Sequence, residues 1–193
     1  MRTILKRMIM ALAAVAFLGT GSVFASPQAS SPGASKMDDL AYLSERASTL
    51  LAEIQKESTG LRLHADTLGT FAGSPRYSWQ SHIFYLNKVK GHINAVGERT
   101  AELQQIRYAV LPWQQQAITE VTSHAAKVAA STQAAIVYLN ENQARHSVPE
   151  YRDNLTIIAH SSEDMKQTVD KFLDYEKTQR KLQQLQNELE LGG

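Results

Sequence analysis

Histidine is the residue type in this sequence best suited to chemistry, because its ring nitrogens bind metal ions and exchange protons near neutral pH. The chain has six His and no Cys. Three of them, His64, His82 and His146, lie close to expected breaks between helices. In an antiparallel bundle these breaks meet at one end, where facing imidazoles can bind zinc or copper. The spacing therefore predicts a metal or small-ligand site at that end.

The same histidines also fit a structural role, and we favour that interpretation. His64 and His82 fall on apolar stripes, where a polar side chain more often fixes the packing register than binds a metal. The chain has no Glu-x-x-His pair and no His pair four residues apart, which helical metal sites commonly use. Haem b would need a His and a Met, or two His, on facing helices, and Met37 and Met165 are not placed for it. We expect no cofactor.

The sequence contains no motif of the other common catalytic sites. Without Cys there is no disulfide framework, no zinc ribbon and no thiol nucleophile. The chain also lacks G-x-S-x-G, a P-loop, G-x-G-x-x-G and H-E-x-x-H. These absences predict a protein that is not an enzyme.

The N-terminus has the pattern of a secretory signal peptide over residues 1–25. Three basic residues precede an apolar run at 8–18, and small residues then occupy positions −3 and −1 of a cleavage point after Ala25. Eleven apolar residues are too few to span a bilayer, which takes about 20. The pattern predicts an exported protein, periplasmic or extracellular, with no membrane contact after cleavage.

Removal of the signal peptide changes the charge of the chain. It leaves 17 Lys and Arg against 19 Asp and Glu, and the basic residues are scattered rather than gathered into a stripe. This distribution does not favour nucleic-acid binding. Residues 26–37 are mostly Ser, Pro, Ala and Gly, a composition that predicts a disordered leader.

Apolar residues then recur every three or four positions in four stretches, 38–69, 74–110, 113–143 and 150–189. This period is typical of one face of an α-helix. Ser74 and Ser147 are the expected caps of the second and fourth helices, and Pro112 separates the second from the third. The short connections predict an all-α, antiparallel up-down-up-down four-helix bundle over residues 38–177, with a long C-terminal helix.

The C-terminal segment 178–193 extends beyond the other predicted helices. It is rich in Gln, Lys, Arg and Glu, and its three leucines Leu182, Leu185 and Leu189 favour a short coiled coil. Our leading hypothesis is an exported, non-enzymatic bundle that acts through self-association or a protein partner on this helix. The alternative is a metal- or small-ligand-binding bundle that uses the three histidines. A chaperone-like bundle is a third option. It would expose an apolar concave face, whereas the apolar stripes here are narrow enough to be buried entirely between the helices.

Overall fold

The computed structural model describes residues 32–72, 74, 76–142 and 148–191 of the chain, which form one compact unit. Almost all of these residues are helical, and none of them lies in a β-strand. The predicted all-α class is therefore confirmed. The elements are α1 (Pro32–Ala72), α2 (Trp79–Ile106), the 3₁₀ turn η1 (Arg107–Ala109), α3 (Pro112–Glu141) and α4 (Pro149–Leu191).

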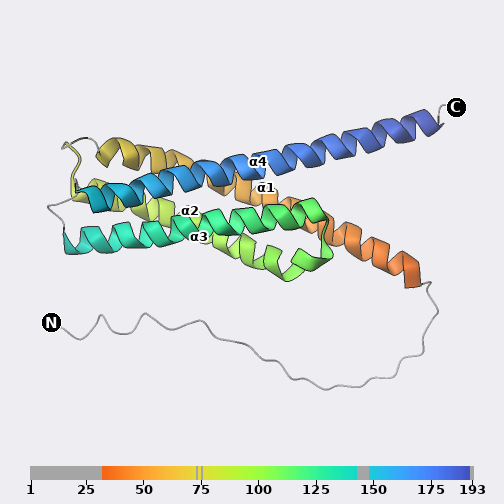
Figure 1. Cartoon of the computed structure of the whole chain (residues 1–193), viewed down its shortest axis with the longest axis horizontal. Helices are drawn as coiled ribbons and strands as arrows, with labels where there is room; N and C mark the ends of the chain where they lie inside the picture. Colours follow the sequence, from red (N-terminus) through yellow and green to blue (C-terminus); the bar gives the residue numbers. More distant parts are fainter. Residues whose placement is uncertain (1–31, 73, 75, 143–147, 192–193) are drawn as a thin grey trace, which may run out of the picture. The chain divides into compact units, whose positions relative to one another are not determined.

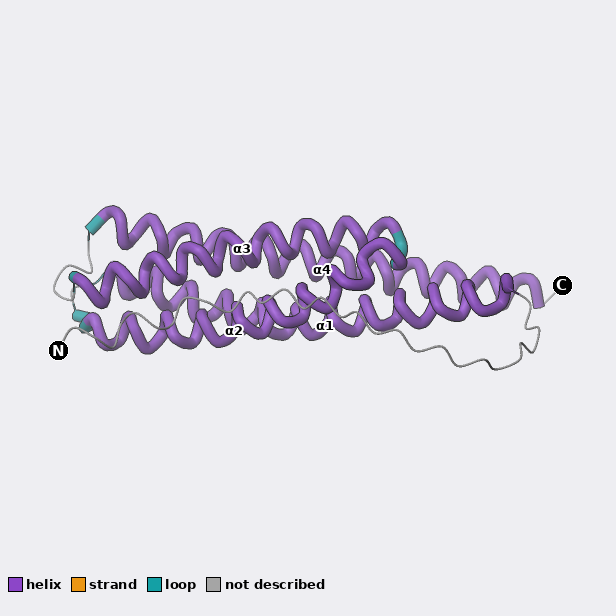
Figure 2. Tube along the Cα trace, turned by 90° about the horizontal axis from the view of Figure 1, so that it is seen from below, coloured by secondary structure: helices purple, strands orange, loops and turns teal. Residues whose placement is uncertain are grey.

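The four α-helices run antiparallel in sequence order and lie side by side (Figures 1 and 2). Each helix packs against the next one, and α1 packs against α4 to close the ring. α1 and α3 meet only marginally, as expected of diagonal helices in a four-helix bundle. This arrangement confirms the predicted up-down-up-down topology. No described helix is both long and apolar enough to cross a membrane.

The core forms from the predicted apolar stripes. A stripe with a period of three to four residues points to one side of its helix, so four such stripes meet along the axis of the bundle. In α3 and α4 every residue of the predicted stripes up to residue 172 is buried. These residues are Ile118, Val121, Ala125, Val128, Thr132, Ala135 and Leu139 on α3, and Tyr151, Leu155, Ile158, Ser162, Met165, Val169 and Phe172 on α4.

Pro112 separates α2 from α3 as predicted. Its ring fits the first position of a helix, where no intrahelical N–H bond is needed. Leu111 before it is extended, with φ −62° and ψ 149°. The backbone N–H of Leu111 donates to the side-chain oxygen of Gln114 at 3.1 Å, which ties the turn to the first residues of α3.

Two helix starts differ from the predicted ones. The cap of α2 is Ser78 and not Ser74, because the Ser78 hydroxyl accepts from the Ser81 N–H at 3.4 Å and the turn continues to residue 78. α1 begins at Pro32, within the predicted leader, since Pro is well placed in a first helical turn. The signal peptide, residues 26–31 and Ser147 lie outside the described residues.

α1 and α4 run past the turn between α2 and α3 at the same end of the bundle (Figure 1). α1 has 41 residues and α4 has 43, whereas α2 has 28 and α3 has 30. We call residues 32–43 of α1 together with residues 178–191 of α4 the two-helix extension. We call the remainder of the described chain the four-helix section.

Candidate functional site

His82 is a core residue that bonds to the facing helix. Its side chain is fully buried, and its Nδ1 lies 2.9 Å from the hydroxyl of Tyr151 on α4. Burial raises the pKa of the Tyr151 phenol well above its ordinary value. The pair therefore joins α2 to α4 through a buried hydrogen bond, as expected of a polar contact inside a bundle.

His64 lies apart from His82, with aromatic rings between them. It stacks on His92 with ring centroids 5.3 Å apart and contacts the edge of Tyr85 at 5.7 Å. Tyr85 in turn contacts Phe71, whose ring lies 5.8 Å from that of His82.

The metal prediction gains no support from these surroundings. Within the described residues no group of three His, Asp or Glu side chains is arranged to hold a metal ion. His146, the third predicted ligand, lies outside those residues, so the complete three-histidine site stays a prediction.

A histidine–carboxylate pair that we did not predict joins α1 to α2. His92 Nδ1 lies 2.8 Å from Glu57 Oε2, and both side chains are about one quarter exposed at 28%. Gly60 makes room for this ring, because a Cβ built there would lie 2.5 Å from His92 Cε1. The sequence signal for this contact was Glu57 itself, a carboxylate on the predicted apolar stripe, which must be paired, protonated or outside the core. Desolvation, with repulsion from His92 and Lys88, lowers the pKa of His64.

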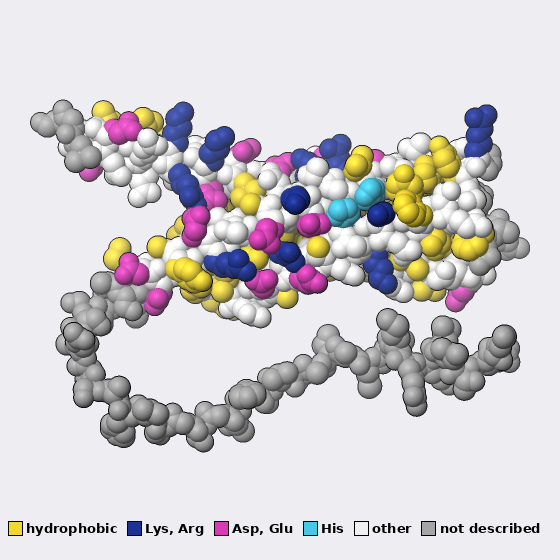
Figure 3. Space-filling model, turned by 180° about the vertical axis from the view of Figure 1, so that it is seen from behind, with side chains coloured by type: hydrophobic (Ala, Val, Ile, Leu, Met, Phe, Trp, Pro, Cys, Tyr) yellow, Lys and Arg dark blue, Asp and Glu magenta, His cyan; other side chains and the backbone are white. Residues whose placement is uncertain are grey.

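A cleft of about 780 Å³ lies at the end of the bundle where α2 turns into α3. It is lined by residues 41–45 of α1, by the start of α3 with the residue before it, and by residues 175–186 of α4. The space-filling view shows the gap between the two arms of the molecule (Figure 3). The lining is mixed, with aromatic and amide side chains beside charged ones. It comprises Ala41, Ser44, Glu45, Leu111, Trp113, Tyr175, Glu176, Gln179, Arg180, Leu182, Gln183 and Gln186.

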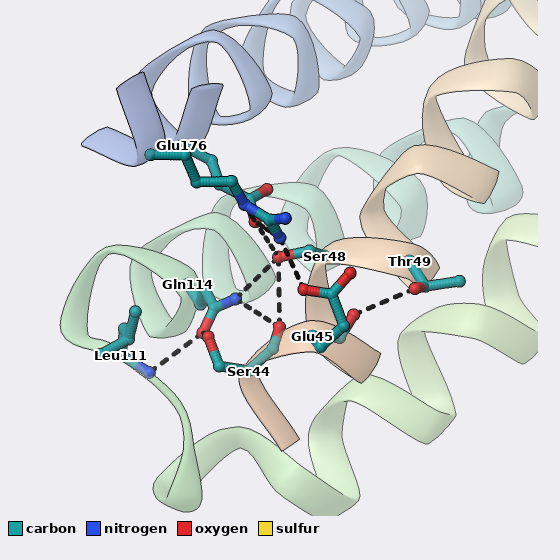
Figure 4. A network of polar contacts seen from close by, with 8 residues as sticks. Ser44, Glu45, Ser48, Thr49, Leu111, Gln114 and Glu176 are labelled. Atoms are coloured by element: carbon teal, nitrogen blue, oxygen red, sulfur yellow. Dashed lines mark hydrogen bonds and ion pairs between the residues drawn. The ribbon is translucent and has the colours of Figure 1, made fainter. Parts of the chain in front are cut away.

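Gln114 organises the floor of this cleft (Figure 4). Its fully buried amide donates to the Ser44 carbonyl at 2.8 Å and to Ser48 Oγ at 3.1 Å. Its oxygen accepts from Ser44 Oγ and from the Leu111 N–H, both at 3.1 Å. One amide thus joins α1, the α2–α3 turn and α3, and all its hydrogen-bonding groups are used.

A charged group then ties α4 to α1 at the cleft wall. Ser48 Oγ donates to Glu176 at 2.7 Å, and Arg180 bonds to both Glu176 and Glu45 at 2.6 Å. The hydrogen bonds that Arg180 donates to Glu176 and Glu45 raise the pKa of Arg180. Arg180 and its two carboxylates are therefore already satisfied within the chain.

Beyond Arg180, α4 exposes the three leucines that the sequence singled out. Leu182, Leu185 and Leu189 are 51%, 46% and 78% exposed. Leu182 lines the cleft. On α1 the extension adds Met37 and Leu40, which are 76% and 43% exposed. The two-helix extension thus carries apolar side chains that no described residue covers fully.

No family model, no curated protein and no solved structure matches this chain. Its function therefore has to be argued from its own geometry. Three features of the described residues are candidates: the buried pair of His82 and Tyr151, the pair of Glu57 and His92, and the cleft with the uncovered leucines beside it. Of these three features, the cleft and the leucines are the most open to solvent.

Proposed function

We propose that this chain is an exported, non-enzymatic bundle that acts by protein–protein contact through its two-helix extension. The observation that carries the proposal is the exposure of Leu182, Leu185 and Leu189 on a helix that continues past its own core. Three leucines on about 14 residues of exposed helix form an apolar face of the kind that binds another protein.

The spacing of these leucines favours a helical partner. Residues three and seven positions apart share one side of a helix, which is the arrangement of a coiled-coil seam. The Gln, Lys, Arg and Glu residues around them keep the other sides of α4 polar. The four-helix section supplies a rigid base, because the Gln114 network and Arg180 fix the root of the extension.

The signal-peptide pattern of residues 1–25 supports export as the second part of the proposal. The two parts are independent, because an exposed leucine face can act in any compartment. Export is tested by N-terminal sequencing of the protein recovered from producing cells. We expect the mature chain to begin at Ser26, and an uncleaved chain retained in the cytoplasm would contradict this part.

Protein contact is tested by photocrosslinking in the cells that make the protein. A photoreactive residue placed at Leu185 should give a crosslinked product of defined mass. The matched control is the same residue at Ile157, which is also apolar, 44% exposed and on α4, but within the four-helix section. Equal labelling at both positions, or none at Leu185, would overturn the proposal. Metal analysis of the same purified protein addresses the alternative, because one zinc or copper per chain would favour the histidine site.

A further inference from the structure

We propose that the partner of the two-helix extension is a second copy of this chain, whose α4 pairs with α4 of the first copy in antiparallel orientation. In this pairing Leu182 of each copy packs against Leu185 of the other. The inference rests on the proposed function and names its partner.

The seam is longer than the three leucines. Tyr175, Thr178, Leu182, Leu185 and Leu189 follow one another at alternating spacings of three and four residues. These are the a and d positions of successive heptads, which lie on one side of the helix. All five side chains are exposed in the single chain. Two such faces therefore cover each other over two heptads.

The charges beside the seam decide the orientation. Lys181 and Glu188 both flank it on the same side, seven residues apart. If Leu182 lies opposite Leu185 of an antiparallel copy, Lys181 lies opposite Glu188 of that copy, and the reciprocal pair forms by symmetry. A parallel pair would place Lys181 beside Gln186 and gain no ion pair. Charge complementarity therefore favours the antiparallel arrangement.

The flanking residues on the other side of the seam agree with this register. Gln179 of one copy lies opposite Gln186 of the other, and two side-chain amides can donate to and accept from each other. In the described chain neither Lys181 nor Glu188 forms an ion pair, and Glu188 accepts one hydrogen bond, from the Gln184 amide at 2.8 Å. Arg180, in contrast, is already bonded to Glu45 and Glu176. The two charges that the pairing needs are therefore not neutralised by an opposite charge in the described part of the chain.

The seam borders the cleft. Its residues Tyr175 and Leu182 line the cleft on the α4 side, and Ala41 and Ser44 line it from α1. Thr178, Leu185 and Leu189 are not among the lining residues, so a second α4 that packs on the seam lies beside the cleft. The antiparallel direction carries its Leu189 to Thr178, next to the aromatic floor where Trp113 and Tyr175 lie with ring centroids 5.7 Å apart.

Disulfide trapping tests the arrangement, because the chain has no cysteine of its own. We prepare Thr178→Cys and Leu189→Cys as separate proteins of residues 26–193, one with a mass tag. The antiparallel register places these two positions in one layer, so oxidation of the mixture should give a mixed disulfide dimer, and neither protein alone should dimerise readily. Dimers of Leu189→Cys with itself would indicate a parallel pair and overturn the proposal.

Charge reversal tests the same register without cysteine. Lys181→Glu and Glu188→Lys should each weaken the dimer about tenfold, since each replaces two attractive pairs with two repulsive ones. The double variant should restore the original dimer. Light scattering supplies the mass, and circular dichroism verifies that every variant keeps its helical content. Two weak single variants without rescue by the double variant would overturn the antiparallel register.

The outcomes separate this inference from the proposed function. A wild-type mass of one chain at the highest concentration reached would overturn self-pairing. If Leu185 still crosslinks to a different protein in cells, the proposed function stands and its partner is not a second copy. If neither a dimer nor a crosslink forms, both proposals fail.

Discussion

The same two helices, α1 and α4, build two regions with opposite properties. In the four-helix section their apolar stripes are covered by α2 and α3, and residues such as Leu61 and Met165 are fully buried. In the two-helix extension α2 and α3 have ended, and Leu40 and Leu189 are exposed. The neighbouring helices are shorter, and the apolar positions of α4 also shift by one residue between Phe172 and Leu182.

This contrast separates the part that forms the core from the part that we propose to bind a partner. Burial of an apolar side chain stabilises the fold only if another element covers it, so side chains of the four-helix section contribute to unfolding free energy. The leucines of the extension contribute little to the free energy of unfolding as long as they are exposed. Substitutions in the two regions should therefore affect different measurements.

The largest contrast is expected between two leucine truncations. Leu61→Ala leaves a cavity in the core and should lower the free energy of unfolding by about 2–5 kcal/mol. Leu189→Ala removes a side chain that is 78% exposed and should change it little. Urea denaturation at low protein concentration measures both. A large loss in Leu189→Ala would show that the extension is part of the folding core.

Gln114→Ala disrupts the hydrogen-bond network at the boundary between the two regions. This change removes four hydrogen bonds and leaves the buried Ser48 hydroxyl without one of its partners, at an expected cost of about 1–3 kcal/mol. The control is Gln116→Ala, two residues along α3, whose exposed amide bonds only to Glu120. Equal unfolding free energies for the two variants would contradict the role of Gln114 as the link between α1 and α3.

A pair of glycine substitutions sharpens the comparison within the four-helix section. Alanine has a higher helix propensity than glycine, and a Cβ at Gly97 meets no atom within 4 Å, so Gly97→Ala should stabilise the protein by about 0.5–1 kcal/mol. Gly60→Ala should destabilise it, because the new Cβ displaces the His92 ring from Glu57. Thermal unfolding ranks the variants. A stabilised Gly60→Ala protein would mean that the ring moves away at no cost.

The smallest effect concerns the pH dependence of stability. Burial and the nearby His92 and Lys88 lower the pKa of His64 in the folded state, so the unfolded chain binds its proton first as the pH falls through about 6.5. Stability should therefore decline below that pH. His64→Gln should show a smaller decline, and His160→Gln on the exposed side of α4 serves as the control. Identical pH profiles for all three proteins would exclude His64 as a contributor.

The sequence predicted the fold well because its signals are local and repeated. The stripes from Ile118 to Leu139 and from Tyr151 to Phe172 determine which side of α3 and α4 is buried, and Pro112 ends one helix before the next. The start of α2 was misplaced because Ser74 and Ser78 both suit a cap. The choice between them depends on the turn geometry, which sequence pattern does not contain.

The site was predicted only in part, for a related reason. The leucines of α4 were recognised as candidates for contact because their spacing is local. The pairing of Glu57 with His92 depends on contact between two helices far apart in sequence, and so does the Gln114 network. Gln114 resembles any polar residue in a first helical turn until α1 is placed against it. Likewise, the sequence did not predict that α1 would extend alongside α4.

The unbroken course of α4 across the boundary between the two regions bears on how the protein is degraded. Residues after Arg180 are held by the hydrogen bonds of their own helix, so brief local opening there breaks no core contact. Amide hydrogen exchange should therefore become faster along α4 from Phe172 toward residue 191. A protease should cut this segment first and leave the four-helix section intact. Such a cut would remove the leucines of the proposed contact without unfolding the four-helix section.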